Sequence, residues 1–455
     1  MKVHFISIGG TAMHNLAIAL HKKGYSITGS DDEIFEPSKS RLKKYELLPK
    51  NIGWDTSKIT NNIDAIILGM HARKDNPELL KAKKLNLKIY SYPEYLYEQT
   101  KNKTRVVIGG SHGKTTITSI IMFVLKYNKV DFDYMVGSQI EGFETMVSLS
   151  ENSEIAVFEG DEYLSSPIDR RPKFHLYKPN IALLSGIAWD HINVFPTFEN
   201  YVEQFKIFIN KIEKNGTLIY FNEDPVLKKI TQNINNDINK IPYSAHKYII
   251  ENNETLLITD KTKKPIQLFG EHNMQNINGA RLICNKLGIS NENFYSAVSK
   301  FTGATKRLQL ITKNDKTNIY LDFAHSPSKL KATTSAVKQQ YPQRDLVACI
   351  ELHTFSSLNE KFLPHYKETM SKADLAIVYF NPKAISHKKL KQLEKKQVKD
   401  AFNHKNSKVF TDIDELINFL MSINFKNKNL LLMSSGNFSG INIDELATNL
   451  IKQAF

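Results

Sequence analysis

The sequence predicts an α/β protein of three domains, and three observations lead to that prediction. Strand-like and helix-like segments alternate along most of the chain, as in parallel sheets covered by helices. The length of 455 residues corresponds to about three domains at roughly 150 residues each. A glycine-rich run between a strand and a helix, Ile108–Thr116, opens the middle domain. We expect the domains to span residues 1–102, 103–302 and 303–455.

The first domain alternates short β-branched runs with amphipathic segments. Its expected strands are Val3–Ile8, Tyr25–Gly29, Asp64–Gly69 and Lys88–Tyr90. Its expected helices are Ala12–Lys22, Pro77–Leu85 and Pro93–Gln99, the last beginning with proline at a first-turn position. This order predicts a Rossmann-like domain with a parallel sheet.

The other two domains repeat the alternation. In the middle domain we expect the strands Thr104–Ile108, Ile155–Glu159, Ile181–Ser185 and Leu218–Phe221, and the helices Thr118–Lys126, Phe198–Ile212, Met274–Leu287 and Asn291–Lys300. In the third, which is again Rossmann-like, we expect the strands Ile319–Phe323, Leu346–Ile350, Leu375–Tyr379 and Leu430–Met433, and a helix at Pro327–Gln340. The Asn-rich stretch Asn233–Asn239 is predicted to be a surface loop.

The composition limits the function classes. Hydrophobic residues make up 41% and charged residues 24%, ordinary values for a globular protein. No apolar stretch approaches the roughly 18–20 residues that cross a bilayer, so stable membrane insertion is not expected. Cys284 and Cys349 are the only cysteines, which excludes a disulfide framework and a Cys-rich zinc site. Without a signal-peptide pattern, the expected location is the cytoplasm.

The net charge of +14 raises the question of an anionic partner. The lysines are dispersed, with short clusters such as Lys388-Lys389 and no basic track interleaved with aromatic residues. We therefore expect no nucleic-acid partner, and a P-loop motor that moves along nucleic acid is disfavoured. The charge reflects either a Lys-rich proteome or a highly anionic small substrate.

The run Gly110-Ser111-His112-Gly113-Lys114-Thr115-Thr116 predicts a phosphate-binding loop. Its glycines let backbone N–H groups approach phosphate oxygens, and the start of the following helix adds positive potential. Lys114 would reach the terminal phosphates, and the Thr115 hydroxyl would bind Mg²⁺. Ile108 stands where the general pattern has a glycine, so the loop is a shortened form. A chance match is the alternative.

Other polar residues follow predicted strands. The turn Gly9-Gly10-Thr11-Ala12 suits a diphosphate, and Asp31 either bonds a sugar hydroxyl or is a solvated loop carboxylate or helix cap. Glu159, in the acidic run Glu159–Glu162, is placed to hold Mg²⁺ on phosphates. His191 is a metal ligand or a loop histidine. The remaining candidates, which could also be surface charges or helix caps, are His272, Asn273, Asn276, Arg307 and Asp322.

Together and in this order, the motifs resemble the Mur ligase family over essentially the whole chain. The family pattern is G-T-x-G-K-T-[ST], E-x-D-E, D-H, G-x-H-N-x-x-N, R-R and D-[YF]-A-H-x-P. The chain departs from it at Ser111, Gly160 and Lys306. The resemblance implies an ATP-dependent ligase that forms an amide bond through an acyl phosphate, with three domains that bind a UDP-linked substrate, ATP and an amine.

The resemblance also implies roles for single residues. Lys114, His191 and Arg307 would be catalytic, and Thr115, Glu159 and His191 would hold metal. ATP would contact the phosphate loop together with Asn273, Asn276, Arg307 and Asp322. UDP-N-acetylmuramate would contact Gly9, Gly10, Thr11, Ala12, Asp31 and His71. Some relatives carry a carbamylated lysine where this chain has Lys206, but a solvent-facing lysine is the preferred interpretation here.

Two branches of the family take UDP-N-acetylmuramate. One adds L-alanine, and the other, murein peptide ligase, attaches a recycled L-alanyl-γ-D-glutamyl-meso-diaminopimelate tripeptide. Gly29–Pro37, Gly69–Pro77 and Asp169–Phe174 resemble the second branch, whereas Glu351–Ser357 is closer to the first. We therefore expect the tripeptide as the amine substrate and a role in peptidoglycan recycling, with L-alanine addition in de novo synthesis as the alternative. A silent UDP-sugar-binding protein is disfavoured by the intact Lys114-Thr115.

Overall fold

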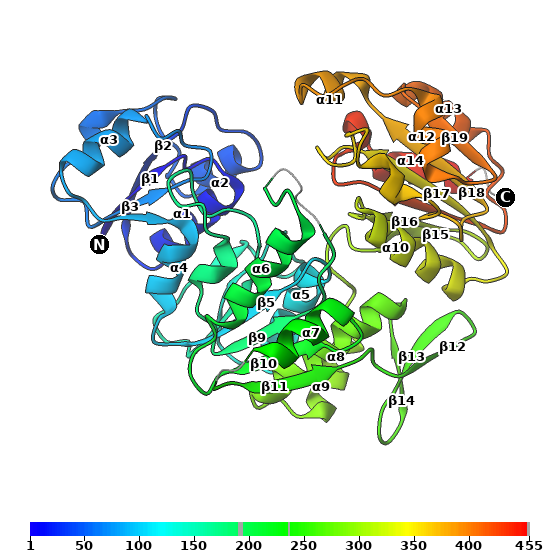
Figure 1. Cartoon of the computed structure of the whole chain (residues 1–455), viewed down its shortest axis with the longest axis horizontal. Helices are drawn as coiled ribbons and strands as arrows, with labels where there is room; N and C mark the ends of the chain where they lie inside the picture. The colour runs from blue at the N-terminus through cyan, green and yellow to red at the C-terminus, as the bar shows by residue number, and fades with distance from the viewer. Residues whose placement is uncertain (190–193, 235–236, 453–455) are drawn as a thin grey trace. The chain divides into compact units, whose positions relative to one another are not determined.

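The computed structural model describes residues 1–189, 194–234 and 237–452. These residues form two compact units (Figure 1). The first unit comprises the described residues of Met1–Ile187, Phe198–Ser244 and Gly279–Ala297, and the second comprises those of Ala188–Thr197, Ala245–Asn278 and Val298–Phe455. Each sheet described below lies within one unit.

The first sheet is parallel, with the strand order β2-β1-β3-β4. Its strands are β1 (Lys2–Ile6), β2 (Ser26–Ser30), β3 (Ala65–Leu68) and β4 (Ile89–Ser91), and its helices are α1 (Thr11–Lys22), α2 (Ser38–Lys44), α3 (Pro77–Lys84) and α4 (Tyr92–Thr100), with a 3₁₀ turn η1 at Thr56–Lys58. Ser91 and Glu94 form a capping box at the start of α4. The order reverses between β1 and β3, so their carboxyl ends flank the crevice where ligands of such sheets bind.

The second sheet places β5, the strand before the phosphate loop, at its centre. The strand order is β11-β10-β9-β5-β8-β6-β7, parallel except for the hairpin of β6 and β7. The strands are β5 (Thr104–Gly109), β6 (Asp133–Met135), β7 (Val147–Ser148), β8 (Ile155–Glu159), β9 (Ile181–Leu184), β10 (Thr217–Phe221) and β11 (Asn239–Tyr243). The helices are α5 (Lys114–Tyr127), α6 (Phe198–Ile209) and α7 (Pro225–Asn233), with a 3₁₀ turn η2 at Lys173–Leu176.

A small antiparallel sheet that the sequence analysis did not predict opens the second unit. Its strands are β12 (Tyr248–Glu251), β13 (Glu254–Ile258) and β14 (Lys263–Ile266). Asn252 and Asn253 join the first two strands with φ angles of 52° and 63°, as a two-residue hairpin turn requires. Helix α8 (Glu271–Lys286) follows in the sequence, and after it comes α9 (Asn291–Val298).

The third large sheet has the order β15-β16-β20-β17-β18-β19, parallel except for β15. The strands are β15 (Gln309–Lys313), β16 (Asn318–Asp322), β17 (Asp345–Leu352), β18 (Leu375–Phe380), β19 (Ser407–Phe410) and β20 (Lys428–Met433). The helices are α10 (Pro327–Gln340), α11 (Pro382–His387), α12 (Lys395–Phe402), α13 (Ile413–Met421) and α14 (Ile443–Lys452), with 3₁₀ turns η3 (Leu363–Tyr366) and η4 (Phe438–Gly440).

Side chains of β17 alternate between two cores. Ala348 and Ile350 pack in the core that includes α10 and α12, whereas Val347 and Cys349 pack with α13 and α14. The sheet is therefore covered on both faces, as parallel sheets are.

The α/β class predicted from the sequence is confirmed. The helix predicted at Thr118–Lys126 begins earlier, at Lys114, because Gly113 turns the chain into it with a φ of 75°. The predicted loop Asn233–Asn239 contains the end of α7 and the start of β11, and residues 235–236 lie outside the described part of the chain. Among the described residues, no helix combines the length and apolarity needed to span a membrane.

Candidate active site

The phosphate loop connects β5 to α5 and depends on two glycines. Gly110 has a φ of 123° and Gly113 a φ of 75°, both in the region that favours glycine. A Cβ on Gly110 would lie 2.2 Å from the Ser185 hydroxyl oxygen, so a larger residue does not fit there. The Ser185 hydroxyl donates to the His112 carbonyl, and the Ser111 N–H donates to Gly186 O at 3.0 Å. The loop is thus held against the end of β9, with the N-terminus of α5 directly behind it.

Lys114 is the first residue of α5 and lies among carboxylates. Its ammonium donates to Glu162 Oε2 at 2.6 Å and to the Gly110 carbonyl at 2.7 Å. Burial by itself lowers the pKa of Lys114, but the charges of Glu162, Asp161 and Glu159 outweigh it, and the net pKa is raised. Lys114 therefore carries its charge at neutral pH. This charge sits where phosphate would bind.

Glu162 and Tyr201 join the two ends of the phosphate loop. The Tyr201 hydroxyl, from α6, donates to Glu162 Oε1 at 3.0 Å and lies 2.9 Å from the Ser111 hydroxyl. Both side chains are buried. Glu162 belongs to the acidic run Glu159–Glu162, but no role was predicted for it from the sequence. Tyr201 was not predicted either, because an aromatic residue in an amphipathic helix looks like ordinary core.

Thr115 and Glu159 lie together beside Lys114. The Thr115 hydroxyl donates to Glu159 Oε1 at 2.9 Å, and the Gly137 N–H donates to Glu159 Oε2 at 2.7 Å. Hydroxyl and carboxylate oxygens are ligands that Mg²⁺ prefers, so this pair fits the ion that was predicted. Within the described residues, no three His, Cys, Asp or Glu side chains gather as a metal cluster. His191, the third predicted ligand, lies outside the described residues.

Lys206 lies on α6. Its ammonium pairs with Glu203 Oε2 at 2.9 Å, and its side chain is 43% exposed. This pair on the helix surface agrees with the interpretation as a solvent-facing lysine.

The residues predicted to bind a UDP-sugar meet at the carboxyl edge of the first sheet. Gly9–Ala12 follow β1, Asp31 follows β2, and the exposed His71 follows β3. Asp31 Oδ2 accepts the Gly9 N–H at 2.7 Å, and a Cβ on Gly9 would lie 2.9 Å from the same oxygen. Burial raises the pKa of Asp31 to about 6, and the neighbouring Asp32 contributes. Asp31 thus positions the glycine turn.

Asn15 links this turn to the second sheet and was missed in the sequence. Its Nδ2 donates to the Thr11 carbonyl at 2.8 Å, and its Oδ1 accepts the Met146 N–H at 2.9 Å. Asn15 is fully buried on α1, and Met146 precedes β7. One amide side chain therefore connects the predicted substrate turn to the domain with the phosphate loop.

The remaining predicted ATP contacts lie in the second unit. Asn273 and Asn276 are buried in the first turns of α8, where Asn273 Nδ2 donates to Phe269 O at 2.9 Å and Asn276 Nδ2 donates to Asn273 Oδ1 at 3.3 Å. Asp322 ends β16 and accepts the Thr333 hydroxyl at 2.7 Å. The Arg307 guanidinium lies 4.8 Å from the Phe323 ring centre.

A second cluster lies at the carboxyl edge of the third large sheet. The buried Glu351 is the residue before the end of β17, and its Oε2 accepts the Ser434 hydroxyl and, at 2.8 Å, the Phe438 N–H. A Cβ on Gly436 would lie 2.8 Å from Glu351 Oε2, so the loop after β20 packs closely on this carboxylate. Connections leave β17 and β20 toward opposite faces, which makes this edge the expected ligand crevice of the sheet.

Comparisons with known proteins cover nearly the whole chain. Residues 2–104 match the Mur ligase family catalytic domain, residues 108–284 match the Mur ligase middle domain, and residues 306–436 match the Mur ligase glutamate ligase domain. These matches confirm the predicted three-domain architecture.

Several curated relatives share one name. UDP-N-acetylmuramate–L-alanine ligase from Desulforamulus reducens is 30% identical, with 83% of this chain and 82% of that protein covered. The protein of the same name from Borreliella burgdorferi is 28% identical, with 96% of each covered.

Two solved structures show the same fold at lower identity. The UDP-N-acetylmuramate–alanine ligase of Thermotoga maritima has a TM-score of 0.71 at 18% identity and covers 100% of this chain and 99% of its own. A murein peptide ligase from Psychrobacter arcticus has a TM-score of 0.65 at 22% identity and covers 99% and 98%.

The expectation of a tripeptide substrate and a recycling role is wrong, because the curated relatives are named L-alanine ligases. The structure gives a physical reason why the segment Asp169–Phe174 misled: the Arg171 guanidinium is occupied by Asp169 at 2.7 Å and by Glu94 at 3.2 Å. These ion pairs of Arg171 stabilise the turn that contains Asp169. The matches leave no doubt about the family or the kind of reaction: the chain belongs to the Mur ligase family and is an ATP-dependent ligase that forms amide bonds.

Proposed function

We propose that the chain joins the carboxylate of UDP-N-acetylmuramate to the amino group of L-alanine in peptidoglycan synthesis. The observation that carries the substrate is the shared name of the curated relatives. The geometry supports the chemistry, since a charged Lys114 and a buried Thr115–Glu159 pair flank the phosphate loop. Both nucleotide substrates are cytoplasmic metabolites, which supports a cytoplasmic location.

We assign one substrate to each domain. Residues 1–102 would bind UDP-N-acetylmuramate at Gly9–Ala12, Asp31 and His71. Residues 103–302 would bind ATP at Gly110–Thr116, with Asn273 and Asn276 toward the adenine. Residues 303–455 would bind L-alanine and complete the ATP site with Arg307 and Asp322.

The reaction has two steps. The muramyl carboxylate attacks the γ-phosphorus of ATP, which gives an acyl phosphate and ADP. The amine of L-alanine then attacks the acyl carbon, loses a proton and expels inorganic phosphate. Phosphorylation is needed because oxide is a poor leaving group, and the protein contributes positioning and neutralisation of charge.

The phosphate loop supplies most of that neutralisation. The N–H groups at the start of α5 and the ammonium of Lys114 would bind the phosphates. Phosphate oxygens would then replace Glu162 as the partner of Lys114, since both need the same ammonium. Thr115, Glu159 and His191 would hold Mg²⁺, which would neutralise phosphate charge when bound.

The amine site is proposed at the carboxyl edge of the third large sheet. Glu351 holds the loop Ser434–Phe438 through its carboxylate, and His353 beside it is partly exposed, with 41% of its side chain accessible. These polar residues lie at the switch point between β17 and β20, where ligands of parallel sheets bind, which supports an amino-acid site there.

The test is a competition between amines. The purified chain is incubated with ATP, Mg²⁺, UDP-N-acetylmuramate and equal concentrations of L-alanine and the L-alanyl-γ-D-glutamyl-meso-diaminopimelate tripeptide, and the products are weighed by mass spectrometry. We expect a product that carries a single alanine. A product that carries the tripeptide alone would contradict the proposed substrate, and Lys114→Ala serves as the inactive control.

A further inference from the structure

The turn Ser165–Phe174 is held in shape, or braced, by hydrogen bonds and an ion pair between its own residues. The Ser166 N–H donates to Asp169 O, and the Ser165 hydroxyl donates to Arg171 O. The Arg171 guanidinium donates to the Asp169 carboxylate through Nε at 3.0 Å and through Nη2 at 2.7 Å. The proposed reaction gives this segment no role, so its fixed shape needs another explanation.

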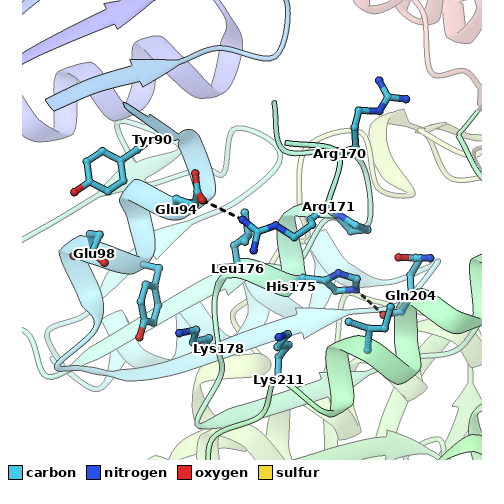
Figure 2. Close-up of a pocket in the computed structure, with 13 residues that line it drawn as sticks. Tyr90, Glu94, Glu98, Arg170, Arg171, His175, Leu176, Lys178, Gln204 and Lys211 are labelled. Atoms are coloured by element: carbon cyan, nitrogen blue, oxygen red, sulfur yellow. Dashed lines mark hydrogen bonds and ion pairs between the residues drawn. The ribbon is translucent and has the colours of Figure 1, made fainter. Parts of the chain in front are cut away.

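The braced turn forms one wall of a cavity of about 690 Å³ (Figure 2). Tyr90, with Glu94 and Tyr97 of α4, lines one side, and His175 and Leu176 of η2 line another. Ile207 of α6 adds an apolar surface. A volume of this size is typical of small-molecule sites, which occupy roughly 300–1,000 Å³.

The cavity is separate from the candidate ATP site. Lys178 lies shortly before β9, and Lys211 lies between α6 and β10. These positions are at the amino ends of the parallel strands, whereas the phosphate loop and Glu159 lie at the carboxyl ends. An occupant of the cavity would therefore not compete for Lys114.

The cavity carries a surplus of positive charge. Its carboxylates are engaged: Glu94 accepts the Ser91 N–H and the Arg171 guanidinium, and Glu98 pairs with Lys101 at 3.1 Å. Lys178 lies 4.8 Å from the centre of the Tyr97 ring. In the described part of the chain, neither Lys178 nor Lys211 has an ion-pair partner. Two ammonium groups thus line a partly apolar cavity, and neither is ion-paired with Glu94 or Glu98, the two carboxylates that line it with them.

His175 lies beside this charge and does not add to it. Its Nε2 is 2.8 Å from Gln204 O, as Figure 2 shows, and its ring stacks on Phe174 with 4.8 Å between the ring centres. Burial lowers the pKa of His175 to about 4, and the charges of Lys211 and Arg171 contribute. The ring is therefore neutral at pH 7 and forms part of the wall.

We propose that this cavity binds a small organic phosphate. The phosphate group would lie between Lys178 and Lys211, and the organic body would pack on Tyr90, Leu176 and Ile207. A phosphate fits two ammonium groups better than a carboxylate does, because a phosphate monoester carries about −1.5 to −2 charges at pH 7. Of the two guanidinium groups that line the cavity, on Arg170 and Arg171, the second is already occupied by Asp169. The occupant would contact α4 of the first domain together with η2 and α6 of the second.

The test uses phenyl phosphate as the probe and does not depend on turnover. Binding to the full chain is measured by calorimetry at low ionic strength, where charge–charge attraction is least screened. We expect saturable binding that weakens on the order of tenfold in Lys178→Gln and in Lys211→Gln, because each loses a charged contact to phosphate. The matched control Lys214→Gln, an exposed lysine nearby, should bind as the wild type does.

Two further measurements separate this site from the ATP site. Lys114→Ala should bind phenyl phosphate unchanged, and in histidine-labelled protein the probe should raise the pKa of His175, because a dianion beside Lys211 offsets its charge. Absence of saturable binding would overturn the proposal. Binding that is lost in Lys114→Ala but retained in Lys178→Gln and Lys211→Gln would also overturn it, because the probe would then occupy the phosphate loop.

Discussion

At the scale of single residues, the pairing of Lys114 with Glu162 dominates the phosphate loop. Glu162 is 1% exposed, and its carboxylate lies 2.6 Å from the ammonium. Removing one member of such a pair leaves a buried charge without compensation, which costs about 3–5 kcal/mol. Variants of Lys114 must therefore distinguish a loss of catalysis from a loss of stability.

Lys114→Ala should reduce ligation on the order of 10²-fold or more, because it removes charge stabilisation from the transferring phosphoryl group. It should also lower stability through the unpaired Glu162. The double variant Lys114→Met, Glu162→Gln removes both charges and should regain stability in urea unfolding while remaining inactive. If the double variant regains turnover as well, Lys114 has only a structural role.

Glu159→Gln should raise the Mg²⁺ concentration needed for half-maximal activity, since it removes a charged oxygen from the proposed ligand set. The amide oxygen can still accept the Thr115 hydroxyl, whereas the amide NH₂ cannot accept the Gly137 N–H that Glu159 Oε2 accepts. A Mg²⁺ titration of steady-state rates measures the effect, with the exposed Glu223→Gln as control. Coincident titration curves for wild type and Glu159→Gln would argue against this metal site.

The raised pKa of Asp31 predicts that the stability of the chain depends on pH. Its pKa rises from 3.8 to about 6 on folding, chiefly because of burial. Between these two pKa values the folded chain holds the proton of the Asp31 carboxyl more tightly than the unfolded chain does. The contribution of Asp31 to the free energy of unfolding therefore falls as the pH rises from about 4 to about 6, and it is constant above about pH 6. Asp31→Asn cannot titrate, so the stability of wild type relative to this variant should decrease across that range in urea unfolding. Parallel pH curves would show that Asp31 does not titrate in this way.

At the scale of elements, α1 carries the coupling between the first two sheets. Asn15 bonds the Thr11 carbonyl in the predicted substrate turn and the Met146 N–H before β7. On the surface of the same contact, Glu144 pairs with Lys22 at 2.7 Å and with Lys44 at 2.8 Å, and these charges hold the pKa of Glu144 down at about 2. The exposed ion pairs contribute little to the stability of this contact, and we expect the buried Asn15 amide to contribute more.

Asn15→Ala should destabilise the chain by about 1–3 kcal/mol, because it leaves the buried Met146 N–H without an acceptor. It should also raise KM for UDP-N-acetylmuramate more than KM for ATP, since the turn at Thr11 loses its support. Steady-state kinetics with each substrate varied, together with urea unfolding, measure the two effects. The exposed Asn62→Ala is the control, and equal changes in both KM values would speak against the coupling.

Elements with a strong local pattern were predictable from the sequence. The strand Ile155–Glu159 and the helix Pro327–Gln340 have the predicted bounds, because a β-branched run and an N-terminal proline define them locally. The hairpin of β12 and β13 was missed, although Asn252-Asn253 between alternating apolar residues is a hairpin signal. Contacts between distant residues carry no local signal, and Lys114 and Glu162 are 48 residues apart.

At the scale of the whole molecule, the family and the reaction class follow from the order of motifs, but the amine substrate does not. The segment Asp169–Phe174 resembled the tripeptide branch, yet in the structure its charges are used to brace a turn beside an unassigned cavity. Sequence resemblance in a loop reports a shared shape as readily as a shared substrate.

The central claim is acyl transfer from UDP-N-acetylmuramate to L-alanine through an acyl phosphate. It is tested most directly with UDP-N-acetylmuramate that carries ¹⁸O in both carboxylate oxygens, incubated with ATP, Mg²⁺ and L-alanine. One labelled oxygen should appear in inorganic phosphate and the other should remain in the amide of the product, both detected by mass spectrometry. Unlabelled phosphate in the presence of L-alanine, or transfer of label that requires the tripeptide instead, would contradict the account.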